Sequence, residues 1–512
     1  MTTAPTNPTP PAGPPAALLP PVPMPARPPV ELWPGWRGPK NPPGAAALAA
    51  LGAGAAVAAI TLPVDRPGLG WLLAAVAGAA AVAVAVGRPE THRPGFVAWS
   101  VATILLLGVG TVRAAEWLFA LCALAAGVTA ALALVDARSA RAMAVGLLAP
   151  VPAMMRALPW TYRGARAIQQ RNGNRQAARA LAVAAVSAVL LLVFGALFAA
   201  ADIAFGELVE RLLPSVSGSF VARLLVLFPA LVVALAGAAF LRSAPPDLTK
   251  LTGPARRHLR TLEWAVPVGL LVLLFLTFVV VQLTVLFGGT RHVLGPDGPT
   301  FAEYARGGFW QLLAVTGLTL LVIAAAGRWA PRESTGERAL IRTLLGALAA
   351  LTLVIVASAL YRMQVYEQAY GYTRLRIFVF AVEIALGVVF LLVIAAGVRL
   401  RTGWLPRAVV AVGVLTLLGL AVLNPDRFVA DRNIDRHLAS GRIDIRYLST
   451  LSADATPALD RLTGDDRSCA LSARWVALAN RRDGWRDLNV ARDRARDLLT
   501  ARPPDPCLLG AD

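Results

Sequence analysis

The sequence predicts an all-α fold: a polytopic transmembrane helical bundle of about eleven spans, followed by a small helical extracytoplasmic C-terminal domain. The 512 residues are 57% hydrophobic and only 15% charged, with a mean hydropathy of +0.61. Soluble domains are typically about a quarter charged. The apolar residues also gather in runs of about 18 or more, and in lipid only a helix satisfies the backbone polar groups of such a run.

Composition divides the chain into five parts. Residues 1–43 contain sixteen prolines and are expected to form a disordered, cytoplasmic N-terminus, because they cannot bury a core. Four spans are expected in 44–135 and seven in 180–423, separated by a basic segment at 136–179, and residues 424–512 are expected to form the soluble helical domain. The expected spans are 44–62, 68–87, 95–112, 115–135, 180–200, 219–241, 264–287, 309–327, 339–361, 375–398 and 405–423.

The loops between the expected spans are unequally charged. If the N-terminus is cytoplasmic, the segments placed inside carry 25 Lys and Arg residues, whereas the short segments placed outside carry 8. Cytoplasmic loops are enriched in Lys and Arg. The sequence therefore predicts a multi-pass protein of the plasma membrane with its N-terminus in the cytoplasm and its C-terminus outside.

The longest inner loop, 136–179, contains eight Arg and one Asp. Its apolar part, Met143–Trp160, is interrupted by Pro150 and Pro152, and further arginines follow it. This pattern is typical of a segment lying on the inner leaflet with its arginines near anionic phospholipid head groups. The alternative is that the arginines only set the topology.

Several function classes are disfavoured. The net charge is +19, and the basic residues cluster in short loops beside apolar segments. This pattern indicates membrane topology and not nucleic-acid binding. The four histidines are scattered and no CxxC occurs, so neither a metal site nor a cofactor is predicted. Standard nucleotide-binding, zinc-protease and serine-hydrolase motifs are absent from the sequence. The 47 arginines against two lysines match the codon bias of a GC-rich bacterium.

Residues 424–512 differ from the rest of the chain. Their 14 Asp and 15 Arg nearly cancel, and helix signals recur. An apolar stripe at helical spacing is formed by Trp485, Leu488, Ala491, Ala495, Leu498 and Leu499. Cys469 and Cys507 lie in this part, and outside the cytoplasm they can form a disulfide. Two free thiols are the alternative, because spacing alone does not establish the geometry.

Two outer loops mix aromatic and charged residues. They are Phe301–Leu312 and Tyr361–Arg376. One interpretation is an outward-facing site that binds an anionic ligand; the alternative is an aromatic belt with arginines reaching the head groups. The candidate ligand-binding residues from these loops are Arg306, Arg362, Tyr370, Arg374 and Arg376.

Glu383 is the most informative single residue. It lies two helical turns, about 10 Å, beyond Arg376 on the same helix face. A carboxylate at this depth is costly unless it faces a partner or water. We therefore expect Glu383, Arg376, Arg374 and Tyr370 to form one polar cluster, with Arg306 approaching it. The alternative is a purely structural hydrogen bond to another helix.

Three segments resemble a known family. The sequence is similar to the bacterial membrane-protein family called domain of unknown function 4153, with its relative 4173, over roughly residues 180–465. The resemblance implies a multi-spanning membrane protein and brings no catalytic residues. The segments that carry it are Glu303–Leu312; Tyr361–Arg376; and Asn424-Pro-Asp426 with Asn433, Gly441-Arg-Ile-Asp444, Tyr447-Leu448, Leu451-Ser-Ala-Asp454 and Pro457-Ala-Leu459.

The sequence favours a non-enzymatic membrane protein of the bacterial cell envelope that binds, transports or senses a ligand. The lipid bilayer is its expected partner, and a membrane-protein partner is left open. The alternative is an enzyme that uses a lipid-linked substrate, similar to multi-spanning glycosyltransferases. Those enzymes need an acidic residue in a substantial first outer loop, whereas here that loop is only Pro63–Pro67.

The predicted topology can be tested with reporter fusions. Because the loop charges place 136–179 inside and the C-terminal part outside, a fusion after residue 160 should report the cytoplasm and one after residue 450 the exterior. Fusions at both positions that report the same side would contradict the topology.

Overall fold

The computed structural model describes residues 36–507, except for 64, 88–92, 136, 138, 172–182, most of 184–222, 248–258, 288–308 and 401. Every regular element in this part of the chain is a helix, so the fold is all-α, as the sequence predicts. The expected Pro-rich N-terminus falls mostly on residues 1–35, outside the described residues. The described residues all belong to one compact unit, Trp36–Asp512.

Most helices are long and apolar. Within the described residues, nine are suited in length and composition to cross a membrane, or ten if one bent pair counts as a span. They confirm an integral membrane protein with many spans, although the expected fifth span, 180–200, lies mostly outside the described residues. The nine are α2 (Leu69–Val86), α4 (Pro94–Val112), α5 (Glu116–Leu134), α11 (Phe228–Ser243, preceded by the π-helix Arg223–Leu227), α12 (Thr261–Phe287), α14 (Phe309–Trp329), α15 (Thr335–Tyr370), α16 (Arg374–Arg399) and α17 (Leu405–Leu423).

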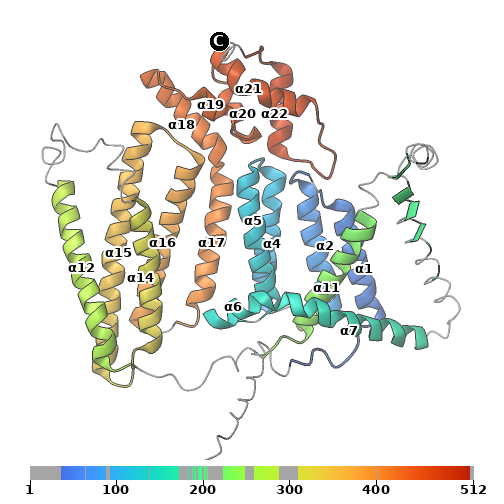
Figure 1. Cartoon of the computed structure of the whole chain (residues 1–512), viewed down its shortest axis with the longest axis horizontal. Coiled ribbons are helices and arrows are strands. Elements are labelled where there is room, and N and C mark those ends of the chain that lie inside the picture. The colour runs from blue at the N-terminus through green and yellow to red at the C-terminus, as the bar shows by residue number, and fades with distance from the viewer. Residues whose placement is uncertain are drawn as a thin grey trace, which may run out of the picture. The chain divides into compact units, whose positions relative to one another are not determined.

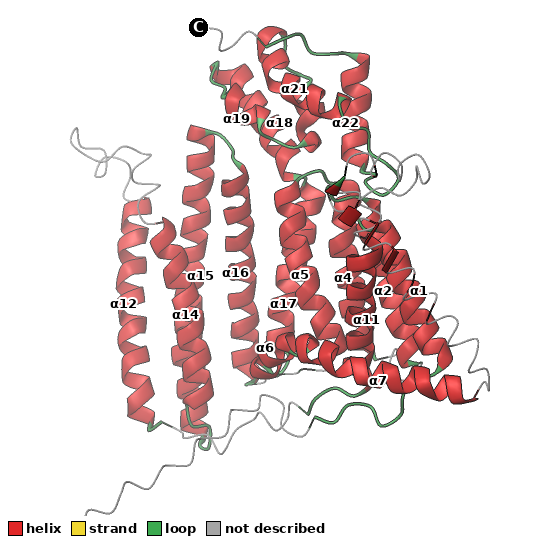
Figure 2. Ribbon diagram, turned by 45° about the vertical axis from the view of Figure 1, so that its right-hand side comes forward, coloured by secondary structure: helices red, strands yellow, loops and turns green. Residues whose placement is uncertain are grey.

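Two groups of spans are joined through α17. In the first group, the shorter apolar helix α1 (Ala45–Thr61) packs with α2 and α11. Helix α2 also contacts α4, and α4 packs against α5. The helices α12, α14, α15 and α16 form the second group around a core that includes Trp264, Leu348 and Phe390. Because α17 contacts α4 and α5 on one side and α16 on the other, it connects the groups (Figure 2).

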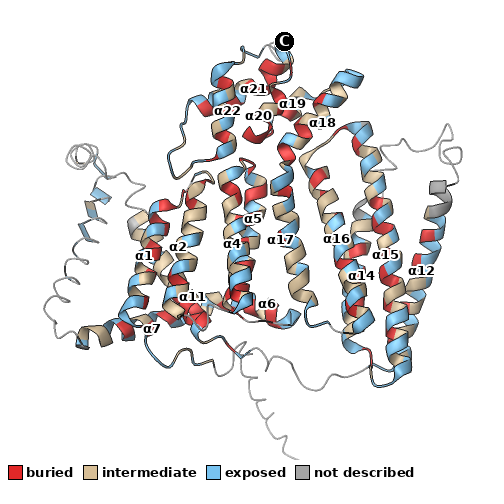
Figure 3. Ribbon diagram, turned by 180° about the vertical axis from the view of Figure 1, so that it is seen from behind, coloured by how far each residue is buried: buried red, intermediate tan, exposed pale blue. Residues whose placement is uncertain are grey.

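Exposed residues run along the spans in Figure 3, for example on α12 and α15. Many of these are large apolar side chains, such as Leu124, Leu273 and Leu391. In a soluble protein such surface would be costly, whereas in a bilayer it faces lipid tails. The exposed apolar surface therefore supports the membrane assignment.

Successive segments between the spans lie at opposite ends of the bundle. At one end, Trp36 donates a hydrogen bond to the carbonyl of Ala244 (2.7 Å), and Arg407 donates one to Ala137 (2.9 Å). At the other end, Arg223 donates to the carbonyls of Ala59 and Leu62. The described segments predicted to be cytoplasmic thus lie at the first end, and those predicted to be outside lie at the second, together with the C-terminal helices (Figure 1).

The C-terminal helices share their core with the spans. Buried Leu118 and Cys122 of α5 belong to the same apolar cluster as Leu448, Leu459 and Leu471. The structure therefore does not separate residues 424–512 as an independent domain. The helices are α18 (Pro425–Ser440), α19 (Ile445–Ser449), the 3-10 turn η4 (Ala453–Ala455), α20 (Thr456–Leu459), α21 (Gly464–Ala479) and α22 (Val490–Ala501).

The apolar stripe expected from Trp485 to Leu499 is only partly helical. The last helix begins at Val490, while Trp485 and Leu488 lie before it and are exposed. Asn489 caps α22 by accepting a hydrogen bond from the backbone N–H of Arg492 (3.0 Å). The preceding residues pair with the start of α2 instead, because Leu69 N–H donates to the carbonyl of Leu488 (3.0 Å). Tertiary pairing therefore overrides the local periodicity.

Cys469 on α21 and Cys507 are joined by a disulfide, and Cys122 is free and buried. The bond closes a loop with a sequence separation of 38. It ties the end of the described chain to α21, beside the hydrogen bond from Arg467 to the carbonyl of Arg502 (2.7 Å).

The thiols give the second prediction. Alkylation of the denatured, unreduced protein should modify one cysteine, Cys122, and prior reduction should raise the count to three, as read by mass spectrometry. Loss of the bond in Cys469→Ser should lower stability by up to about 4 kcal/mol, because the loop is long. Three modified thiols without reduction would contradict the disulfide.

Candidate functional site

A buried carboxylate lies where the C-terminal helices meet the spans. Asn424 ends α17 and caps α18, which places Asp426 in the first turn of α18. The Asp426 side chain is fully buried and accepts two hydrogen bonds from Arg374 at the start of α16, from Nε (2.7 Å) and Nη2 (2.6 Å). It also accepts bonds from the backbone N–H of Ser452 (2.7 Å) and the indole of Trp117 (3.3 Å). One carboxylate thus connects α16, α18, the turn before η4 and the start of α5.

The surroundings of Asp426 favour its charged form. Burial alone raises the pKa of the carboxyl, but the Arg374 guanidinium and the hydrogen bonds from Ser452 hold the pKa below its ordinary value. Asp426 is therefore ionised, and its bidentate pair with Arg374 fixes α16 against α18.

Asp454, in η4, is the second buried carboxylate. Its Oδ2 accepts hydrogen bonds from the backbone N–H groups of Ala114 (2.7 Å) and Ala115 (3.0 Å), at the start of α5, and from the Ser452 hydroxyl (3.1 Å). Its Oδ1 is buried without a hydrogen-bond partner among the described residues, and Arg113 Nη1 lies 3.9 Å away. Burial raises the pKa of Asp454 above its ordinary value. Oδ2 is therefore satisfied by hydrogen bonds, whereas Oδ1 has only the charge of Arg113 beside it.

Two asparagines, the buried Asn489 and the half-buried Asn433, fix the same junction by pairing with backbone. Asn489 donates to the carbonyls of Gly110 (2.7 Å) and Arg113 (2.9 Å) at the end of α4. Asn433 accepts from the N–H of Tyr372 (3.0 Å) and donates to its carbonyl (2.8 Å), as a neighbouring peptide would. This approach requires glycine at Gly371, where φ is +82° and an added Cβ would lie 2.6 Å from Asn433 Oδ1.

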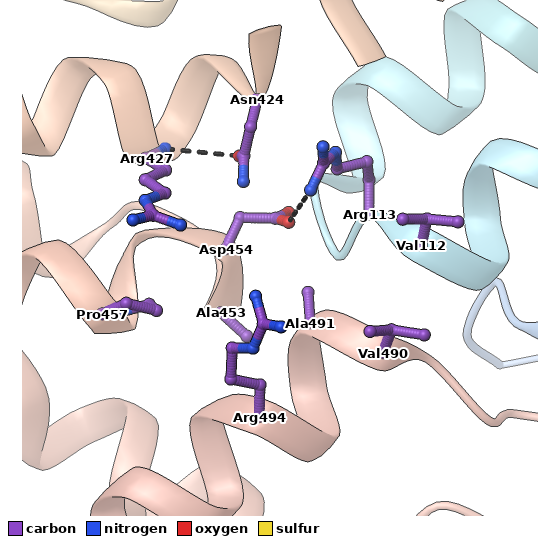
Figure 4. Close-up of a pocket in the computed structure, with 10 residues that line it drawn as sticks. All are labelled: Val112, Arg113, Asn424, Arg427, Ala453, Asp454, Pro457, Val490, Ala491 and Arg494. Atoms are coloured by element: carbon purple, nitrogen blue, oxygen red, sulfur yellow. Dashed lines mark hydrogen bonds and ion pairs between the residues drawn. The ribbon is translucent and has the colours of Figure 1, made fainter. Parts of the chain in front are cut away.

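A pocket of about 210 Å³ opens beside Asp454. Figure 4 shows Asp454 between the side chains of Arg113, Arg427 and Arg494, which come from the end of α4, from α18 and from α22. Arg113 is held in place by a hydrogen bond from Nε to the carbonyl of Ala421 (2.6 Å), whereas Arg427 and Arg494 are exposed. The remaining lining residues are Val112, Asn424, Ala453, Pro457, Val490 and Ala491.

The candidate residues from the outer loops do not form one cluster. Arg374 binds Asp426, and Arg362 donates to Gln282 on α12. Arg376 turns back onto the carbonyls of Tyr370 and Gly371, and its guanidinium lies 4.4 Å from the centroid of the Tyr366 ring. Arg306 lies outside the described residues. The short turn between α15 and α16 therefore separates the neighbouring arginines Arg374 and Arg376.

Glu383 stands apart from these arginines, contrary to the predicted cluster. It is buried in the bundle, and its Oε2 has no hydrogen-bond partner in the described part of the chain. The acid that interacts electrostatically with Arg376 is instead Glu367, one turn before the end of α15. The physical reason is the backbone of the turn, whose carbonyls take up Arg376 before it can extend down the helix toward Glu383.

Sequence reasoning missed both carboxylates at the junction. The sequence does contain a signal for them, because each lies two residues after a residue that can cap a helix. Asp426 follows the cap Asn424 of α18, and Asp454 follows the cap Ser452 of η4. Polar residues at helix starts most often cap their own helix. Here Asp426 and Asp454 reach other helices, which only the tertiary fold reveals. Among the described residues, no group of three or more His, Cys, Asp or Glu side chains is placed to hold a metal ion.

Together, the apolar helices and the polar junction at one of their ends define a polytopic integral membrane protein. A family model described as "Domain of unknown function (DUF4153)" matches residues 101–462, and the chain belongs to this family. No curated protein and no solved structure shows significant similarity to it. The match begins within α4 and not near residue 180, where the sequence motifs placed it. Within the matched residues, Asp454 binds the backbone N–H groups of Ala114 and Ala115, which joins the α4–α5 corner to the C-terminal part of the match.

The third prediction concerns Asp426. Asp426→Asn removes the charge that faces Arg374 and should destabilise the protein by about 3 kcal/mol, measured as thermal or denaturant unfolding in detergent. The matched control, Asp435→Asn, breaks an exposed pair with Arg461 and should cost less than about 1 kcal/mol.

The pH dependence has a defined sign. Because the folded pKa of Asp426 is lowered, its contribution is present above its unfolded pKa of about 4 and is lost as pH falls through the lower folded value. The difference between wild type and Asp426→Asn should therefore persist at about pH 4 and shrink only below it. Equal stability of the two proteins at neutral pH would contradict the assignment.

Proposed function

We propose that this protein binds an anionic ligand at the extracytoplasmic face of a bacterial plasma membrane, in a non-enzymatic binding or sensing role. The observation that carries the proposal is the set of three guanidinium groups, from Arg113, Arg427 and Arg494, around the pocket at Asp454. Guanidinium groups match the geometry of phosphate and carboxylate oxygens and bind them in pairs of hydrogen bonds.

The pocket also selects for a hydrogen-bond donor. Oδ1 of Asp454 is a buried acceptor that has no hydrogen-bond partner among the described residues, although the charge of Arg113 lies 3.9 Å away, and a buried acceptor gains most from a donor. A ligand that carries both an anionic group and a hydroxyl or amine would satisfy the arginines and Asp454 together. A simple inorganic anion would leave Asp454 unsatisfied.

The surface beside the pocket supports an amphiphilic ligand. Val112 lies at the end of α4 and Val422 at the end of α17, and both are exposed at the level where these spans end. Val490, which also lines the pocket, is exposed as well. The head group of an anionic lipid could occupy the pocket while its chains lie along α4 and α17.

The outward orientation rests on two observations. The 25 to 8 distribution of Lys and Arg favours the cytoplasm for the end of the bundle opposite the pocket. The disulfide between Cys469 and Cys507 lies on the pocket side, and disulfides persist mainly outside the cytoplasm. Both observations favour the same orientation.

An enzyme that acts on a lipid-linked substrate is the second candidate. The observation in its favour is Asp454 itself, a carboxylate with a raised pKa that lines a basic pocket and has one oxygen without a hydrogen bond among the described residues. A binding protein needs Asp454 only as an acceptor, whereas an enzyme needs it to exchange protons. Chemical change of a bound lipid by wild type but not by Asp454→Asn would favour the enzyme.

The fourth prediction tests the pocket by native mass spectrometry of the detergent-solubilised full chain. We expect phosphatidylglycerol to bind more tightly than phosphatidylcholine, and glycerol 3-phosphate to compete weakly. Replacing Arg427 and Arg494 together with Gln should weaken phosphatidylglycerol binding by about tenfold per arginine, because each charge-assisted hydrogen bond contributes roughly 1.5–3 kcal/mol.

The matched control replaces two exposed arginines of the same helical region that do not line the pocket, Arg442 and Arg482, with Gln. This control keeps the change in net charge the same. Equal loss of binding in the two double variants would contradict a defined site. Unchanged binding in the pocket variant would reject the proposal.

A further inference from the structure

Helix α7 (Pro150–Arg171) lies across the ends of the spans, at the opposite end from the C-terminal helices (Figures 1 and 2). The short helix α6 (Ala140–Leu148) precedes it, and the two are bent by 51°. The bend falls at Ala149–Pro150, where Pro150 begins the new helix. A helix in this position packs one face against the spans and exposes its other faces.

One face of α7 is fixed to the rest of the protein. Ala153, Ala157, Trp160 and Gly164 recur at helical spacing and are buried. The indole of Trp160 donates to the carbonyl of Asn41 (2.9 Å) and its ring lies 5.8 Å from that of Phe240 on α11. A Cβ at Gly164 would lie 2.6 Å from the Pro43 carbonyl, so this contact requires glycine. The orientation of α7 about its own axis is therefore set.

The opposite face is apolar and exposed. Val151, Met155, Leu158 and Tyr162 recur at the same spacing and are 68%, 69%, 46% and 66% exposed. At about 100° per residue these four side chains fall within one narrow stripe, roughly opposite the buried face. No other described part of the chain covers this stripe, and four large apolar side chains facing water would be costly.

A basic flank separates the apolar stripe from the buried face. Arg156, Arg163 and Arg166 project from this flank, and all three are exposed. Arg156 donates to the carbonyl of Trp36 (3.1 Å) and lies 4.7 Å from the centroid of its ring. Arg163 donates from Nε to the carbonyl of Pro159 within α7 (3.4 Å). At about 100° per residue, Arg166 lies about 50° from the centre of the stripe, and Arg163 and Arg156 lie about 110° and 130° from it on the same side. The arginines thus begin at the edge of the stripe, as at a boundary between lipid tails and head groups.

We infer that α7 lies in the plane of the adjacent leaflet, with its apolar stripe among the lipid tails and its basic flank bound to anionic phospholipid head groups. Charge complementarity identifies the partner, because Arg163 and Arg166 oppose no acidic side chain among the described residues. The position of α7 supports it too, since α7 packs against the apolar helix α1 and the span α11. This surface is independent of the pocket at Asp454.

The immersion of the apolar stripe can be measured by spin labelling of the full chain in vesicles. A nitroxide on Met155→Cys should be accessible to oxygen and shielded from a water-soluble nickel complex. On the basic flank, Gln170→Cys should show the reverse. Cys122 is buried and the other two cysteines are bonded, so only the introduced thiol reacts. High nickel accessibility at Met155→Cys would overturn the inference and indicate water, a partner protein or a second copy.

The head-group contact needs a second measurement. A fluorophore on Met155→Cys should be quenched at least about twofold more strongly by nitroxide-labelled phosphatidylglycerol than by nitroxide-labelled phosphatidylcholine. Arg163→Gln with Arg166→Gln should equalise the two lipids, while Arg442→Gln with Arg482→Gln should leave the preference intact. Equal quenching in the parent protein would reject anionic recognition. Labels at the two ends of α7 that report opposite sides of the vesicle would instead make α6 and α7 a broken span.

Discussion

The pair between Asp426 and Arg374 is the constraint on which the junction depends. Asp426 has no exposed side-chain surface and receives four hydrogen bonds from three separate parts of the chain. A buried charge is tolerated only when it is paired and hydrogen-bonded in this way. Its ionised state therefore requires α16, α18 and the turn before η4 to be in place together. The apolar core that continues from α5 into the C-terminal helices packs around the same point.

Asp454 occupies a similar environment with a different outcome. Its Oδ2 is used to hold the start of α5, but Oδ1 is left facing a pocket that arginines surround. Two carboxylates in one junction thus have pKa values shifted in opposite directions, one by a close guanidinium and one by burial. Carboxylates with perturbed pKa values gather at functional sites. The candidate site therefore lies at the junction between the spans and the C-terminal helices, and not at Glu383 within the bundle.

The two ends of the bundle are specialised differently. At one end the helices α18–α22 cover the spans with a polar, cross-linked layer that contains paired Asp and Arg residues. At the other end, α7 presents an apolar stripe and a basic flank, and Trp36 and Asn41 are tied to it. A polar layer suits water, whereas an amphipathic helix suits a lipid surface. The asymmetry agrees with the charge difference between the loops.

The sequence by itself determined the helical class, the positions of most spans and the alternation of their ends, because a run of apolar residues must form a helix in lipid whatever its neighbours are. It also located the basic segment at 136–179, whose apolar part is interrupted by prolines. The candidate site was decided by the tertiary structure. Arg374 and Asp426 are 52 residues apart, Ala114 and Asp454 are 340 apart, and Gly110 and Asn489 are 379 apart. Helical periodicity relates residues a few positions apart, so it pointed Arg376 toward Glu383. The turn at Gly371 and the helices packed above it directed the arginines elsewhere, because a buried charge binds whichever partner the fold brings within hydrogen-bond distance.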